Sequence, residues 1–250
     1  MKIYVCAHKK VDSILPKNYE YIQANSANNP KIYDLCDNQG DNISKKNPYY
    51  CELTIAYWIW KNDKENDIVG LAHYRRFLTT NKFSSSPKKY INSPKVEKIL
   101  QKYDFIATKQ YKTQKTVKEH LLINVFPHDY DLLEETIKEV YPDYLDSFNQ
   151  VMSGHQSHLL NMFITTKSEW DKYYTWLFNI FDKLEPKVNM DGYTVQQQRL
   201  YGFLSERLFS VYVLKNNKKI YEMPTHIVGE SKFKIMIQKI KKILHFKSSD

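Results

Sequence analysis

The chain has 250 residues, of which 42% are hydrophobic and 26% charged, with only 6 Gly and 9 Pro. This composition excludes disordered, collagen-like and low-complexity proteins and is typical of a globular chain. The formal net charge is +9, but six of the 37 Lys and Arg residues lie in 232–247, and the remaining 31 nearly balance the 28 acidic residues. For the body of the chain we therefore expect no nucleic-acid partner.

The basic segment 232–247 has the pattern of an amphipathic helix, because its apolar residues recur at three- and four-residue steps and most lysines fall off that face. Docking on the body, binding to an anionic membrane surface and binding to RNA all remain open. For the membrane surface, the expected contacts are Lys234, Lys239, Lys241 and Lys242. The predicted organisation is one domain over 1–230 and a tail over 231–250.

Targeting and cysteine patterns indicate a cytoplasmic protein. No stretch reaches the ~18 apolar residues of a membrane span, and the N-terminus meets charges too early for a signal peptide. With the basic tail, this predicts peripheral attachment to the inner face of the cell membrane. Cys6, Cys36 and Cys51 lack paired CxxC spacing, which argues against a disulfide framework and a zinc knuckle.

Strands are expected to alternate with helices along the chain. Residues 2–8 alternate and predict a buried strand that ends at His8. After an Asn-rich stretch, Asn47-Pro48 resembles the start of a helix that continues to Asn62. The apolar run 68–71 predicts a central strand that stops at His73.

The second half continues this alternation. Further strands are predicted over 104–108 and 158–166, and helices over 96–102, from about 129, over 170–184 and over 194–212. The last helix is expected to be strongly amphipathic. Too few glycines are present for a Walker A loop or a GxGxxG fingerprint.

Two groups of polar residues point to chemistry. His73, Arg75 and Arg76 follow the central strand, where open α/β sheets bind ligands, and Arg suits phosphate oxygens. Structural ion pairs are the alternative. Arg199 and Glu206 share one helical face, and Asp191 just before that helix suits a general base or a simple helix-capping role.

Five blocks of the chain resemble a known family. They are AHK at 7–9, DNISKKNPYYCELTIAYWIWKN at 41–62, VGLAHYRRF at 69–77, LLNMFI at 159–164 and QQRLYGFLSERLFSVYV at 197–213. The family was first catalogued as a domain of unknown function in bacterial capsular and exopolysaccharide gene clusters. Several of its members are galactosyl- or galactofuranosyltransferases.

The resemblance implies a GT-A-like fold, a single α/β nucleotide-sugar-binding domain with a mixed, mostly parallel sheet. It implies a UDP-sugar donor, with galactose in furanose or pyranose form. Nine residues are the expected donor-binding groups: His8, Lys9, Lys46, Asn47, His73, Arg75, Arg76, Asn161 and Arg199.

Many GT-A enzymes hold a metal on a DxD motif at the end of the strand that here ends in Ala72-His73-Tyr74-Arg75. We therefore expect no metal and no other cofactor, with His73, Arg75 and Arg76 neutralising the diphosphate directly.

The expected reaction is a single inverting displacement. Asp191, or failing that Glu206, accepts the proton of an acceptor hydroxyl on a lipid-linked oligosaccharide. The pathway would be synthesis of capsule, exopolysaccharide or O-antigen. The alternatives are a noncatalytic RNA- or membrane-binding module and a nucleotide-sugar hydrolase.

Overall fold

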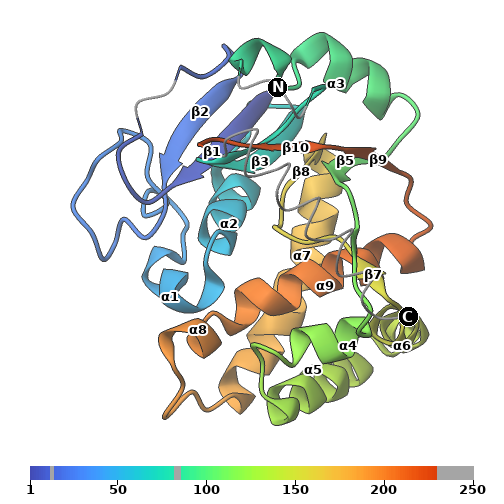
Figure 1. Ribbon diagram of the computed structural model, residues 1–250. Coiled ribbons are helices and arrows are strands. Elements are labelled where there is room, and N and C mark those ends of the chain that lie inside the picture. The colour runs from blue at the N-terminus through green and yellow to red at the C-terminus, as the bar shows by residue number, and fades with distance from the viewer. Residues whose placement is uncertain (12–13, 82–85, 230–250) are drawn as a thin grey trace, which may run out of the picture.

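The computed structural model describes residues 1–11, 14–81 and 86–229 (Figure 1). The strands are β1 (Lys2–Ala7), β2 (Tyr19–Gln23), β3 (Ile68–His73), β4 (Arg76–Leu78), β5 (Phe105–Thr108), β6 (Tyr111–Lys112), β7 (Gln156–Ser157), β8 (Phe163–Thr166), β9 (Ile220–Met223) and β10 (Thr225–Ile227). The α-helices are α1 (Asn47–Tyr50), α2 (Leu53–Asn62), α3 (Ser93–Leu100), α4 (Val117–Leu121), α5 (Pro127–Val140), α6 (Leu145–Ser153), α7 (Lys167–Leu184), α8 (Val195–Gln198) and α9 (Leu200–Lys215).

One large sheet organises the fold. Its strands pair in the order β2, β1, β3, β8, β5 and β9, and β8 alone on this path runs antiparallel to its neighbours. β4 turns back beside the end of β3 and pairs with β10. The predicted α/β class with a mixed, mostly parallel sheet is confirmed. The carboxyl ends of β1, β2 and β3 consequently meet at one edge.

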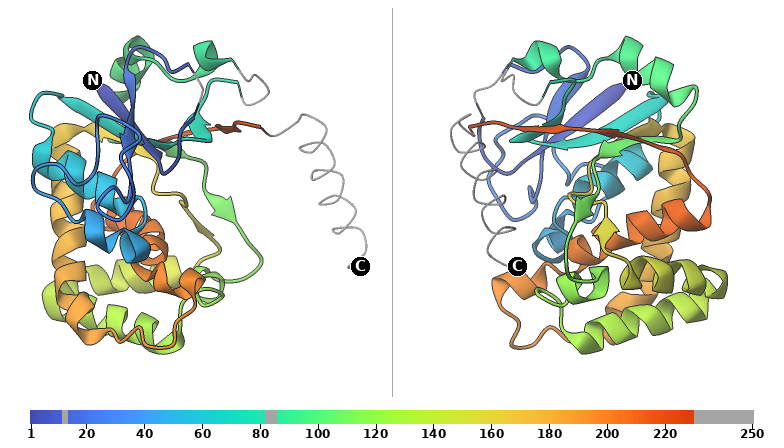
Figure 2. Two further views of the ribbon diagram at one scale, coloured as in Figure 1. Left: turned by 90° about the vertical axis from the view of Figure 1, so that its left-hand side faces the viewer. Right: turned by 45° about the vertical axis from the view of Figure 1, so that its right-hand side comes forward.

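Helices cover both faces of the sheet. Neighbouring residues of a strand point to opposite faces, so each strand contributes apolar side chains to both layers. Tyr4 packs with the helices α2, α7 and α9, whereas Ile3 and Val5 pack with α3. Figures 1 and 2 show α3 on one side of the sheet, α2 and α7 on the other, and the helices α4, α5 and α6 beyond α9.

Three predicted elements differ from the observed ones. The helix expected from Asn47 to Asn62 is interrupted at Cys51, and the helix expected over 194–212 is interrupted at Arg199. The strand expected over 158–166 begins only at Phe163, because Leu160 and Asn161 have positive φ angles. The prediction of a strongly amphipathic last helix was wrong, since buried residues of α9 lie all around the helix between Leu200 and Tyr212, where it packs against α1, α6 and α7.

The predicted tail helix, with Lys234, Lys239, Lys241 and Lys242, lies outside the described residues. Within residues 1–11, 14–81 and 86–229, no helix combines the length and apolar character that crossing a membrane requires.

Candidate functional site

A cavity of about 690 Å³ opens at the carboxyl edge of β1, β2 and β3, and we call it the site cavity. The turn after β1, the turn after β3, the two helix breaks and the Leu160 segment all contribute to its wall. The lining side chains that matter below are His8, Asn47, Cys51, Glu52, His73, Tyr74, Arg76, Leu160, Arg199 and Glu206.

The end of β3 supplies one wall of the site cavity. Nε2 of His73 lies 2.8 Å from the carbonyl oxygen of Leu160. Because a carbonyl oxygen can only accept a hydrogen bond, Nε2 carries the proton. Burial lowers the pKa of His73, so this side chain is neutral near pH 7. Arg76 lines the site cavity, whereas Arg75 is exposed and donates from Nε to the carbonyl oxygen of Val228 at 3.3 Å.

The break between α1 and α2 brings two side chains into the site cavity. Cys51 has φ of 53° and ψ of −132°, a conformation that favours glycine, and Asn47 holds its carbonyl oxygen through Nδ2 at 2.7 Å. Glu52 follows, and its Oε1 accepts a hydrogen bond from Nδ2 of Asn161 at 2.8 Å. No donor among the residues that the structure describes reaches its other oxygen.

The break between α8 and α9 faces the first one. Arg199 donates from Nε to Sγ of Cys51 at 3.2 Å and from NH1 to Gln196 at 3.4 Å. Gly202 permits this approach, because a Cβ there would lie 3.1 Å from Sγ of Cys51. The contact between Cys51 at the first break and Arg199 at the second therefore positions Arg199 in the site cavity.

The Leu160 segment crosses the floor of the site cavity. Its positive φ angles, 80° at Leu160 and 49° at Asn161, turn the backbone N–H of Leu160 toward Oε1 of Glu206 at 2.8 Å. Oγ of Ser205 donates to Oδ1 of Asn161 at 3.1 Å. Such strained, hydrogen-bonded backbone is typical of functional sites.

Glu206 is engaged on both oxygens. Besides the N–H of Leu160, it accepts a hydrogen bond from NH1 of Arg207, whose side chain is buried. Burial raises the pKa of Glu206, while Arg207 opposes that effect. The geometry makes Glu206 a structural anchor of the floor.

A buried carboxylate that the sequence reasoning missed supports the loop above the site cavity. Asp37 is fully buried and accepts hydrogen bonds from the N–H of Asn25 at 2.9 Å and from Oγ of Ser26 and Ser44, both at 2.5 Å. Oγ1 of Thr54 adds a contact of 2.7 Å. Asp37 thus ties α2 to the loop that presents Asn25.

The other predicted residues lie at or near this edge. His8 and Asn47 line the site cavity, and Asn161 holds Glu52 from behind it. Lys9 lies over the ring of Tyr74 at 5.5 Å. Lys46 is paired with Glu185 at 2.6 Å, and Asp191 is exposed and does not line the site cavity.

Residues 2–218 match the model of a protein family described as "Domain of unknown function (DUF4422)". The chain belongs to this family. It is also similar to a solved structure, the apo form of the WbbM bifunctional glycosyltransferase, with a TM-score of 0.85 and 29% sequence identity. A search of curated proteins found no significant match.

The structural likeness covers 92% of this chain but 45% of the WbbM chain, so this chain spans less than half of that neighbour's length. Together with the sheet order, it confirms the GT-A-like fold expected from the resemblance.

The lining of the site cavity does not fit the divalent metal of many GT-A enzymes. Mg²⁺ and Mn²⁺ prefer several carboxylate oxygens, but the end of β3 offers His73, Tyr74 and Arg76. One oxygen of Glu52 and both of Glu206 already accept hydrogen bonds. In the described part of the chain, no three His, Cys, Asp or Glu side chains form a group that could hold an ion.

Proposed function

We propose that this member of the DUF4422 family is a glycosyltransferase. It would transfer galactose, in furanose or pyranose form, from a UDP-sugar to a lipid-linked oligosaccharide. The observation that supports this proposal best is the presence of Arg76 and Arg199 together with two carboxylates in one cavity of a GT-A-like fold. Fixed cations at the carboxyl edge of a parallel sheet suit a diphosphate.

The two arginines would stabilise the leaving group. As the glycosidic bond to the diphosphate breaks, its electron pair moves to the diphosphate oxygen, and Arg76 and Arg199 offset the charge that develops there. His73 is neutral and already donates its Nε2 proton to the carbonyl oxygen of Leu160, so it offers the ligand a hydrogen-bond acceptor at Nδ1 and no positive charge. Arg199 is held in place by Cys51 before any ligand binds.

A carboxylate of the site cavity would accept the proton of the acceptor hydroxyl as its oxygen attacks the anomeric carbon. Glu52 suits this role better than Glu206, because its Oε2 is free of donors from the described residues, whereas both oxygens of Glu206 are engaged. Asp191 would need to move from its exposed position outside the site cavity. A single displacement on one face inverts the anomeric configuration.

The lipid-linked acceptor is proposed because of the basic segment 232–247, whose sequence suits the anionic inner face of the cell membrane. The product would be a growing capsule, exopolysaccharide or O-antigen chain.

A nucleotide-sugar screen tests the proposal. UDP, UDP-galactose and UDP-galactofuranose are compared by thermal shift with and without EDTA, because a ligand of the folded state raises its melting temperature. We expect at least one UDP-sugar to bind in EDTA and, when a soluble oligosaccharide acceptor is added, to yield UDP and an acceptor lengthened by one sugar in mass spectrometry. Free galactose formed in preference to transfer indicates a hydrolase, and the absence of any shift contradicts the proposal.

A further inference from the structure

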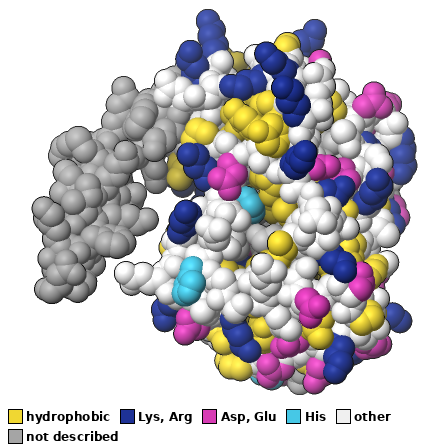
Figure 3. All heavy atoms as spheres, turned by 90° about the vertical axis from the view of Figure 1, so that its right-hand side faces the viewer, with side chains coloured by type: hydrophobic (Ala, Val, Ile, Leu, Met, Phe, Trp, Pro, Cys, Tyr) yellow, Lys and Arg dark blue, Asp and Glu magenta, His cyan; other side chains and the backbone are white. Residues whose placement is uncertain are grey.

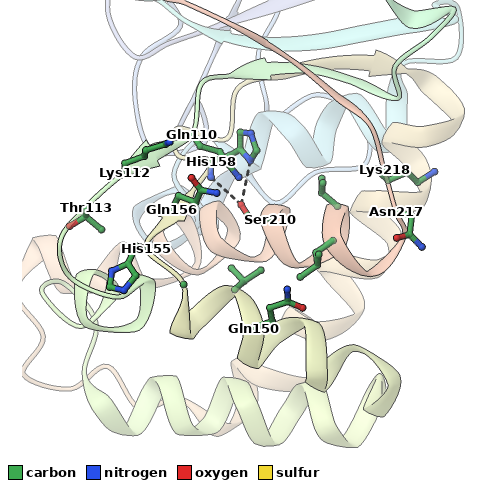
Figure 4. Close-up of a pocket in the computed structure, with 14 residues that line it drawn as sticks. Gln110, Lys112, Thr113, Gln150, His155, Gln156, His158, Ser210, Asn217 and Lys218 are labelled. Carbon is green, nitrogen blue, oxygen red and sulfur yellow. Dashed lines mark hydrogen bonds between the residues drawn. The ribbon is translucent and has the colours of Figure 1, made fainter.

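Two more cavities follow the site cavity, and the first of them lies at the same edge of the sheet. The middle cavity, of about 630 Å³, lies at the ends of β5 and β9, and Leu160 lines both it and the site cavity. The outer cavity, of about 840 Å³, lies between the β6–β7 ribbon, α6 and α9 (Figure 4). Gln110 lines both the middle and the outer cavity. Each cavity therefore shares one lining residue with the next, and the three form a row.

Three amide side chains line the outer cavity. The side chains of Gln110, Gln150 and Gln156 come from three different segments, and Figure 4 shows them around one space. None of the three makes a side-chain hydrogen bond with a residue in the described ranges. An amide both donates and accepts, as does a sugar hydroxyl, so these groups match a polyhydroxylated ligand.

An aromatic ring lies at the junction of the cavities. Tyr111 of β6 lines the middle cavity next to Gln110 and keeps 43% of its surface exposed. An exposed Tyr presents an apolar face and a polar hydroxyl together. Such a ring can cover the apolar C–H face of a pyranose while neighbouring amides bind its hydroxyls.

The charges of the outer cavity favour a neutral ligand. Lys218 is paired with Glu169 at 2.8 Å, and Nε2 of His158 lies 3.3 Å from Glu222. Burial lowers the pKa of His158, so its ring is neutral near pH 7. Lys112 of this wall and Lys109 of the middle cavity are exposed lysines, and neither is paired with a carboxylate among the described residues. Figure 3 shows this side of the molecule hollowed near its centre, with Lys and Arg side chains gathered at its upper end.

We propose that the middle and outer cavities form an acceptor groove for a neutral oligosaccharide. The reactive end of the oligosaccharide would lie over Leu160, next to Glu52 in the site cavity, and the following sugars would extend past Tyr111 to Gln150 and Gln156. This inference rests on the proposed glycosyltransferase function and adds the place where its acceptor binds.

The groove is tested with the full chain and a panel of tetrasaccharides built of galactose, glucose, mannose or N-acetylglucosamine. We expect at least one to bind by calorimetry, more tightly than its monosaccharide. The double variant Gln150→Ala/Gln156→Ala should weaken that affinity by about 30-fold, because two hydrogen bonds to the sugar are lost. Gln101→Ala, an exposed Gln after α3, is the matched control and should leave the affinity unchanged.

UDP binding by the same double variant separates the two proposals. An unchanged UDP affinity with a lost tetrasaccharide affinity supports the groove. The groove proposal is overturned if no tetrasaccharide binds, if the double variant binds normally, or if inorganic phosphate displaces the sugar. Failure of UDP-sugars to bind the unmodified protein contradicts the glycosyltransferase proposal instead.

Discussion

Arg199 and Cys51 join two interrupted helices, because the guanidinium Nε of Arg199 donates to Sγ of Cys51 at 3.2 Å. Each residue lies at the break of its own helix pair, and both line the site cavity. The breaks therefore stabilise each other. Regular helices here would remove the side chains from the site cavity, so the irregular backbone serves the site.

Gly202→Ala should lower the free energy of unfolding by about 1 kcal/mol, because the new Cβ would lie 3.1 Å from Sγ and 3.3 Å from Cβ of Cys51, and the strain of moving Cys51 away from Arg199 exceeds the better helix propensity of Ala. Cys51→Gly removes both atoms and suits the positive φ of that position. We expect Gly202→Ala to cost clearly less in the Cys51→Gly background, as measured by urea unfolding of all four proteins. Equal costs in the two backgrounds would show that the close approach is unimportant.

Arg76→Ala should reduce kcat/KM for sugar transfer by about 100-fold, because a fixed donor to the leaving group is lost. Arg75→Ala tests whether Arg75 also neutralises the diphosphate, as the sequence suggests. Its guanidinium contacts Val228 and does not line the site cavity, so we expect a much smaller kinetic effect. Steady-state kinetics and melting temperatures are measured for both, and a larger loss in Arg75→Ala would reverse the assignment.

Glu52→Gln should lower kcat by about 10²- to 10⁴-fold with little change in the affinity for UDP. The amide keeps an oxygen for the hydrogen bond from Asn161 but cannot take up a proton at neutral pH. Glu206→Gln is the comparison, since it breaks a buried ion pair with Arg207 and should mainly lower the melting temperature. A kinetic loss confined to Glu206→Gln would assign the base to that residue.

Stability should fall as the pH is lowered from 7.5 to 5.5. Burial lowers the pKa of His73 and His158 in the folded protein below the ordinary 6.5, so the unfolded chain binds more protons in this range. The stabilising contribution is present above pH 6.5 and is lost as the pH falls toward the folded pKa values. Urea unfolding at several pH values measures the slope. His158→Gln should flatten it, whereas a similar flattening by exposed His155→Gln would contradict the assignment.

The elements that the sequence predicts best are those whose apolar pattern alone determines them. β1, β3 and β5 follow short buried runs, and α7 follows a long helical repeat that ends in the expected place. The same patterns miss the breaks. Apolar spacing continues through Cys51, so only its contact with Arg199, 148 residues away, reveals the interruption. Long-range partners of this kind leave no local signal.

The candidate site is likewise predictable in part. His8, His73 and Arg76 can be predicted as site residues because they follow apolar runs, and polar residues at the ends of parallel strands gather at one sheet edge. Glu52 lies inside the helix expected over 47–62, and the apolar pattern there gives no sign that its side chain faces the site cavity. Asp37 lies in an Asn-rich stretch without periodicity, and its ring of hydroxyl donors comes from Ser26, Ser44 and Thr54, which only the fold assembles.

The tail should attach the protein to membranes without taking part in transfer. Deleting the chain after Ser231 should abolish sedimentation with anionic liposomes and leave transfer to a soluble acceptor near normal. Each lysine near an anionic surface contributes about 1 kcal/mol, so binding should also weaken as salt rises. A second variant removes charge from the tail without shortening the chain, by substituting Gln for Lys234, Lys239, Lys241 and Lys242.

A matched set of Gln substitutions on the body serves as the control, at the exposed residues Lys45, Lys98, Lys102 and Lys138. The tail set should reduce liposome binding strongly and the body set should not, because a local anchor depends on where its charges lie and not on the net charge. A truncated chain that melts many degrees lower while liposome binding persists would instead place the tail against the body, since removing a packed helix exposes the surface that it covered.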